Sequence, residues 1–401
     1  MAGKRSIFEE VGQSGPSGTG AGKGKTPASS KGLIDASPKG ARAAIRLWMV
    51  LLFVLVAAMI LIGGMTRLTD SGLSITEWNL VTGALPPLNE AAWLIEFEKY
   101  KNFPEFQIQN RMMTLEEFKP IYWWEWAHRF LGRFVGLVWA VGFLWFYLRK
   151  EIPNGWTGRL LLLGALGGLQ GAVGWWMVHS GLQGVRVDVV SYRLATHLGL
   201  AFAILGFLAW YVLALGRSEA ALMTARRGRE AKLFSMTTGL MHFTMLQIVL
   251  GALVAGIDAG RAFPTWPLMG DSFLPPDPFY VPVTGADGQL TVLPWYWAFL
   301  ENAGLVQFIH RMSGYLLMAF GVVVWLRGRR SPHGTTRFAY HMVMAMMVAQ
   351  MALGVFTVLL EAHIHVAITH QLGAMLLFVL ILRARHLAQY PVAGSVREGT
   401  Q

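Results

Sequence analysis

Eight apolar segments of about 20 residues each constrain this chain more than any other feature of its sequence. A segment of that length, wound as an α-helix, crosses the roughly 30 Å hydrocarbon core of a bilayer. Hydrophobic residues make up 54% of the chain, charged residues only 14%, and the mean hydropathy is +0.43. The sequence therefore predicts an all-α integral membrane protein with eight transmembrane helices. The predicted spans are Ile45–Gly64, Tyr122–Leu148, Leu160–His179, Tyr192–Leu215, Leu233–Gly256, Ala303–Leu326, Phe338–Leu360 and Val366–Leu382.

The net charge of +11 is explained by membrane topology better than by nucleic-acid binding. Most Lys and Arg residues lie before the first span, after the last one, or in connections on that same side of the membrane. Cytoplasmic loops carry such an excess of positive charge. We therefore expect both termini to be cytoplasmic and no nucleic-acid partner.

The division of the chain follows from the spans and from composition. The first 44 residues are rich in Gly, Ser, Ala and Lys without apolar periodicity, which predicts disorder. They hold no apolar run with a small-residue cleavage site, and their acidic residues Glu9, Glu10 and Asp35 are unusual for a mitochondrial presequence. We expect a bacterial inner membrane, with a mitochondrial inner membrane as the alternative. The predicted parts are a cytoplasmic tail (1–44), an N-terminal half (45–215) with a large outer loop (65–121) that contains a short amphipathic helix (89–106), a cytoplasmic linker (216–232), a C-terminal half (233–385) and a second cytoplasmic tail (386–401).

A short motif occurs once in each half. WEWAHRFLGR (Trp124–Arg133) and VQFIHRMSGY (Val306–Tyr315) share a His followed by Arg, with Gly four residues after the His. Each copy lies at the start of an apolar segment, and a Thr-His pair follows two segments later, at Thr196-His197 and Thr369-His370. This internal repeat predicts two pseudo-symmetric four-helix bundles.

The four repeated histidines fit two haem sites. All four fall near the outer ends of their spans, within about the first two turns, on helices that run from outside to inside. A haem iron takes one axial ligand on each face, so a bis-imidazole site needs one His from each of two facing helices. The chain has no Cys, which excludes thiolate ligation and iron–sulfur clusters. We expect His128 with His197, and His310 with His370, to bind haem iron.

Other residues near these histidines suit the same chemistry. Glycines close to a ligand let a flat macrocycle approach the backbone, and an Arg directly after a ligand can pair with a haem propionate. A Gln-x-x-x-Gly motif in each half favours helix packing, with contact to a ring as the alternative. These residues are Gly132, Gly199, Gly314 and Gly373, then Arg129 and Arg311, then Gln170 and Gln350.

One difference separates the two halves. Three residues before His128 stands Glu125, whereas Gln307 occupies the equivalent place before His310. A carboxylate one helical turn from a ligand lies on the same helix face and could act at the edge of a bound ring. A structural alternative is that Glu125 caps the outer start of its helix.

Several long strings resemble the haem A synthase family, in the form found in alphaproteobacteria and mitochondria. The resemblance covers about residues 45–385, and the cysteine pair that many bacterial relatives carry in the first outer loop is missing. The strings are GGMTRLTDSGLSITEW (Gly63–Trp78), TGALPPLNE (Thr82–Glu90), EFEKYKNFPEF (Glu96–Phe106), EWAHRFLGR (Glu125–Arg133) and FPTWPLMGDSFLPP (Phe263–Pro276).

The resemblance implies an oxidoreductase that converts the C8 methyl of haem O into the formyl group of haem A, with oxygen from water. It implies one haem B on His310 and His370, the haem O substrate on His128 and His197, and a catalytic role for Glu125. It also implies delivery by a haem O synthase, an electron acceptor of unknown identity and the cytochrome oxidase assembly machinery as partners, in a lipid membrane. Self-association is left open.

Two other functions fit the histidine pattern alone. A di-haem b-type electron carrier would keep both haems chemically unchanged, and a haem transporter or chaperone would move haem without oxidising it. A symmetric carrier has little reason to hold a carboxylate at only one site, so Glu125 favours the enzyme. Formation of haem A from haem O separates the three.

Overall fold

The structure, a computed structural model, describes residues 39–79, 82–182, 187–284 and 289–392. Within them, eight helices are long and apolar enough to cross a membrane, which confirms the predicted fold class. These eight helices are α1 (Lys39–Leu68), α3 (Leu115–Leu148), α4 (Thr157–Gly181), α5 (Ser191–Leu215), α7 (Ala231–Gly256), α10 (Ala303–Gly328), α11 (Gly334–Leu359) and α12 (Ile364–Gln389).

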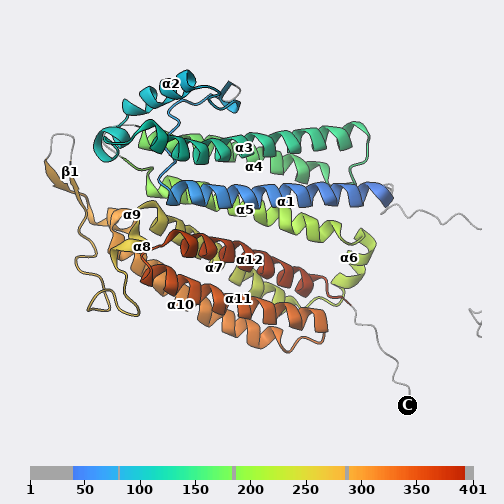
Figure 1. Ribbon diagram of the computed structural model, residues 1–401. Helices are drawn as coiled ribbons and strands as arrows, with labels where there is room; N and C mark the ends of the chain where they lie inside the picture. Colours follow the sequence, from blue (N-terminus) through green and yellow to red (C-terminus); the bar gives the residue numbers. More distant parts are fainter. Residues whose placement is uncertain (1–38, 80–81, 183–186, 285–288, 393–401) are drawn as a thin grey trace, which may run out of the picture.

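The eight helices form two groups of four that lie side by side (Figure 1). Helices α1, α3, α4 and α5 make the N-terminal half, and α7, α10, α11 and α12 make the C-terminal half. The halves meet where α1 and α5 pack against α7 and α12. Inside the membrane region the amide of Gln371 on α12 donates to the Ile60 carbonyl of α1 at 2.6 Å. This bond joins the halves next to His370.

An ion-pair cluster joins the same halves at the end that is predicted to face outside. The Arg67 guanidinium of α1 contacts Asp70 at 2.7 Å and Asp258, beyond the end of α7, at 2.6 Å. Its Nε donates to the Ala255 carbonyl at 3.1 Å. Because the Arg67 side chain is only 14% exposed, these partners compensate for the cost of burying its charge.

The helix ends differ from the predicted spans because capping and packing, rather than apolar length, set them. Helix α3 begins seven residues before the predicted Tyr122, where Thr114 and Glu117 form a capping box. Helix α12 continues to Gln389, so residues 386–389 belong to it and not to the C-terminal tail; there His386 packs on Trp210 with ring centroids 5.4 Å apart. Of the predicted tails, 1–38 and 393–401 lie outside the described residues.

The first outer loop folds into a cap on α3. The short helix predicted at 89–106 is present as α2 (Glu90–Lys101), followed by a π-helical turn, η2 (Glu105–Gln109). The apolar face of α2 packs on α3, with ring centroids 5.0 Å apart for Trp93 and Tyr122. A 3-10 turn, η1 (Thr82–Ala84), precedes α2.

The second outer loop covers the other half. It contains α8 (Ala259–Ala262), the antiparallel strands β1 (Pro282–Thr284) and β2 (Leu290–Val292), η3 (Trp295–Trp297) and α9 (Ala298–Glu301). Val283 lies opposite Thr291 in the strand pair. These elements and α2 gather at one end of the helices, whereas α6 (Glu219–Arg226) lies at the other end, near the two ends of the described chain (Figure 1).

We predict that the end with α2 and the strands faces the outside of the cell membrane and that the end with α6 faces the cytoplasm. A reporter fused after Gly181, at the end of α4, should be exposed outside. A reporter fused after Arg227, directly after α6, should be cytoplasmic. Alkaline phosphatase and fluorescent protein fusions measure both, and the reverse pattern would contradict this orientation.

Candidate functional site

The structure brings the first pair of predicted ligands together. The rings of His128 on α3 and His197 on α5 have centroids 6.4 Å apart. His310 on α10 and His370 on α12 also lie near each other in the C-terminal half. Each half therefore places one imidazole from each of two facing helices in its interior.

The prediction that all four histidines fall within the first two turns of their helices is wrong for His128. The other three occupy the seventh or eighth position of α5, α10 and α12. Helix α3 begins at Leu115, so His128 lies about 20 Å along it at 1.5 Å per residue. The extra turns of α3 carry the outer cap.

Each imidazole faces a glycine on the neighbouring helix. A Cβ atom at any of these glycines would lie about 3 Å from a ring atom, closer than side chains normally approach. The ring therefore needs the space that a side chain would fill. The pairs are Gly63 with His128 (3.0 Å), Gly174 with His197 (2.9 Å), Gly251 with His310 (3.0 Å) and Gly354 with His370 (3.1 Å).

The glycines proposed from sequence serve a different contact. A Cβ at Gly314 would lie 3.3 Å from the Gln247 amide nitrogen, and one at Gly132 would lie 3.6 Å from the Met59 methyl. These glycines, on the histidine helices themselves, make room for side chains of the neighbouring helix. The glycines that face the rings lie on that neighbouring helix, which only the tertiary structure reveals.

Three glutamines bind the histidines across helix interfaces. The amide nitrogens of Gln170, Gln247 and Gln350 donate to the main-chain carbonyls of His197, His310 and His370 at 3.0, 2.9 and 2.8 Å. The same nitrogens lie 3.1–3.2 Å from the Nδ1 atoms of those rings. The sequence reading missed Gln247, although a third Gln-x-x-x-Gly, Gln247–Gly251, was available as a signal.

These sites fit a haem iron. Two imidazoles on opposite sides of one metal ion, with bonds of about 2 Å, have ring centroids roughly 6 Å apart, close to the spacing of the first pair. No group of three or more His, Cys, Asp or Glu that could hold a bare metal ion occurs among the described residues. A pair of imidazoles from two helices suits a metal whose other four ligands come from a macrocycle.

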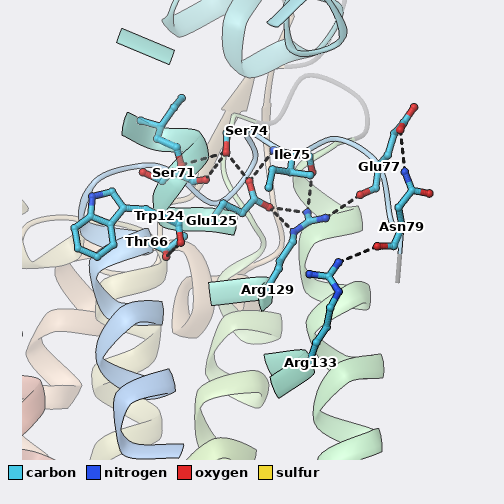
Figure 2. A network of polar contacts seen from close by, with 11 residues as sticks. Thr66, Ser71, Ser74, Ile75, Glu77, Asn79, Trp124, Glu125, Arg129 and Arg133 are labelled. Atoms are coloured by element: carbon cyan, nitrogen blue, oxygen red, sulfur yellow. Dashed lines mark hydrogen bonds and ion pairs between the residues drawn. The ribbon is translucent and has the colours of Figure 1, made fainter. Parts of the chain in front are cut away.

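Glu125 lies in a polar network beneath the outer cap (Figure 2). Its side chain is 3% exposed, and one carboxylate oxygen contacts the Arg129 guanidinium at 2.6 Å. The other oxygen accepts hydrogen bonds from the Ser74 hydroxyl and the Ile75 main-chain N–H, both at 2.7 Å. The alternative reading of Glu125 as a helix cap is wrong, because α3 begins ten residues earlier at its own capping box.

Both candidate propionate partners bind outer loops in this structure. Arg129 donates to the carbonyls of Ile75 and Glu77 at 2.7 and 2.8 Å. Arg311 donates to the carbonyls of Phe263 and Leu268 at 2.8 and 3.1 Å. The buried Nε of Arg311 has no partner among the described residues, so it remains a donor for a carboxylate.

The equivalent residue in the C-terminal half lacks a charge. Gln307 is 2% exposed and donates to the Phe263 carbonyl at 3.4 Å, while its amide oxygen has no partner within the described part of the chain. Arg311 forms no ion pair with it. In both halves, side chains of the histidine helix thus donate hydrogen bonds to carbonyls of a loop. A buried carboxylate takes part in these contacts in the N-terminal half, where the C-terminal half has Gln307.

A second buried acid, Glu105 on η2, lies in the same cap and was not singled out from sequence. It is 4% exposed, and one of its carboxyl oxygens has no partner among the described residues. Burial raises the pKa of Glu105 to about 8, the Tyr100 hydroxyl opposes the rise, and the charges of Glu125, Asp188 and Asp70 add to it. Glu105 therefore favours its protonated form near neutral pH.

Comparisons with known proteins show the family to which the chain is similar. The family described as cytochrome oxidase assembly protein matches residues 46–382. A haem A synthase from Paracoccus denitrificans is 60% identical over 394 residues, covering 98% of both chains. Haem A synthases from Cereibacter sphaeroides (58% identical, 99% of both chains) and Roseobacter denitrificans (57% identical, 99% of this chain and all of the relative) are similarly close.

We predict that Glu105→Gln removes a pH-dependent loss of stability. The Glu105 carboxyl ionises near 4.5 when unfolded and near 8 in the folded cap, so the folded state binds more protons between those values. Stability should therefore decline as pH rises through that window, by on the order of a few kcal/mol, in the wild type but not in the variant. Thermal unfolding in detergent at pH 5 and pH 9 measures the difference. The exposed Glu98→Gln is the control, and parallel behaviour of wild type and Glu105→Gln would contradict the prediction.

Proposed function

This chain belongs to the haem A synthase family of cytochrome oxidase assembly proteins, and from that membership we propose how its two halves divide the conversion of haem O into haem A. His128 and His197 bind the haem O substrate in the N-terminal half. His310 and His370 bind one haem B in the C-terminal half. The observation that carries this division is the buried carboxylate of Glu125 one turn from His128, where the other half has Gln307.

The reaction that we propose oxidises the C8 methyl of haem O to an alcohol and then to a hydrated aldehyde, which loses water to give the formyl group. Each of the two oxidations removes two electrons and two protons, and water supplies the oxygen. His128 and His197 would both hold the haem iron, which is compatible with this reaction because the oxygen comes from water and not from O2 bound at an open coordination position. A haem B on His310 and His370 would supply the one-electron chemistry that carries these electrons to an acceptor.

Glu125 acts on charge and protons at the methyl group. Its carboxylate can stabilise positive charge that develops on the methyl carbon or accept the proton of the attacking water. The Ser74 hydroxyl, the Ile75 N–H and Arg129 fix its position, so little reorganisation is needed during the reaction. The outer cap on α3 excludes bulk water from this side.

Two further features complete the proposal. Arg129 and Arg311 bind propionate carboxylates, Arg311 through its Nε, which has no partner among the described residues. The protein lies in a bacterial inner membrane with both termini in the cytoplasm, receives haem O from a haem O synthase and passes its product to oxidase assembly. The bacterial sources of the relatives support this location.

We predict that the four histidines separate into two classes. His310→Ala or His370→Ala should remove haem B, because the iron loses one axial ligand. His128→Ala or His197→Ala should leave haem B in place and impair binding of haem O. Extraction and chromatography of bound haems measure both. Retention of haem B in both C-terminal variants would contradict the assignment.

We predict that Glu125→Gln blocks conversion without removing haem B. The substitution keeps the side-chain volume and removes the charge, and loss of one such group lowers turnover by roughly 10² to 10³. Haem O should then accumulate. Ser74→Ala is the matched control, since it removes one hydrogen bond to the same carboxylate but leaves its charge, and should cost much less. The measured quantity is haem A formed per mole of bound haem B, and equal ratios in wild type and Glu125→Gln would exclude a catalytic role.

A further inference from the structure

Three of the four glycines that face an imidazole have a glutamine four residues before them in the sequence. These glutamines are the ones that bind the histidines. Each stands four residues before a glycine that faces an imidazole, at Gln170, Gln247 and Gln350. The fourth such glycine is Gly63, which faces His128, and the residue four positions before it is Met59. A thioether thus stands where the other three sites have an amide.

The side chain of Met59 occupies the position equivalent to that of Gln247. In the C-terminal half, Gln247 on α7 lies against Gly314, four residues after His310, at 3.3 Å from the Cβ position of that glycine. In the N-terminal half, the Met59 methyl on α1 lies against Gly132, four residues after His128, at 3.6 Å. The pair α1 and α3 is therefore equivalent to the pair α7 and α10. The side chain between the helices is a thioether in the first pair and an amide in the second.

The exception leaves one histidine without a supporting glutamine. At each of the other three histidines a glutamine amide nitrogen donates to the main-chain carbonyl and lies close to the ring. His128 has no such side-chain partner within the described ranges, and the Met59 thioether has no N–H to donate. Loss of a group that positions a ligating histidine typically costs about 10- to 100-fold in metal affinity.

We propose that Met59 is a positioning residue that makes His128 the releasable axial ligand of this protein. The N-terminal site then holds its haem through His197, which a glutamine positions, and His128, which no glutamine positions, and it exchanges substrate for product. In the C-terminal site glutamines position both histidines, and the haem is retained. This inference rests on the proposed division into substrate and cofactor sites.

The test measures haem release. Purified protein carrying haem O and haem B, without an electron acceptor, is mixed with excess apomyoglobin, and the haem that remains is identified by chromatography. The two pigments report the two sites separately. Met59→Gln should slow the loss of haem O about tenfold or more, while haem B loss stays as in the wild type. Gln247→Met, the mirror substitution, should accelerate the loss of haem B by a similar factor.

Two controls separate hydrogen bonding from packing and folding. Met59→Leu fills similar space but provides no amide, so it should not slow the release of haem O. The absorption spectrum of each variant reports whether bis-imidazole ligation is intact, and single-turnover conversion of bound haem O should persist in Met59→Gln while repeated turnover falls.

Unchanged haem O release in folded Met59→Gln overturns the proposal, and so does unchanged haem B release in Gln247→Met. The two substitutions lie in different halves of the protein. If one variant misfolds, the haem release of the other variant still tests the proposal. A wild-type protein that makes no haem A from haem O would instead refute the proposed function, since release is measured without turnover.

Discussion

The contact between a glycine on one helix and an imidazole on the next is the constraint on which both halves depend. At each of the four places a Cβ would lie about 3 Å from the ring, so the imidazole of one helix lies directly against the backbone of the next. Packing of this kind, rather than hydrophobic burial, holds helices together inside a membrane. The same contact therefore sets the helix spacing and places the four histidines in facing pairs.

Several polar side chains within the helices bind main-chain carbonyls or charged partners, because apolar surroundings make unsatisfied groups costly. Three glutamine amides bind histidine carbonyls, and Gln371 joins the two halves through the Ile60 carbonyl. The buried Glu125 meets Arg129, Ser74 and the main chain of the first outer loop. The polar network thus fixes helix register and holds the caps over the sites.

The departures from symmetry lie together at one site. Glu125, where the other half has a Gln, lies on α3 three residues before His128. Met59, also where the other half has a Gln, lies on α1 and contacts the Gly132 position of α3. The C-terminal half keeps neutral amides at all equivalent places. Under the proposed division of roles, changes at these two side chains would let a frame that occurs twice retain a cofactor at one site and transform a substrate at the other.

The sequence by itself determined the eight spans, the internal repeat and the four histidines, because apolar length and repeated spacing are properties of the chain alone. It also identified Glu125 from its mismatch with Gln307. It could not give the start of α3, which a capping box sets beyond the apolar region, nor the buried acid Glu105 in the cap. Only the tertiary structure decided which glycine faces which ring, that Arg129 pairs with Glu125, and that Gln247 and Met59 are equivalent. Those relations join residues on different segments, and distances between helices are fixed by packing rather than by spacing along the chain.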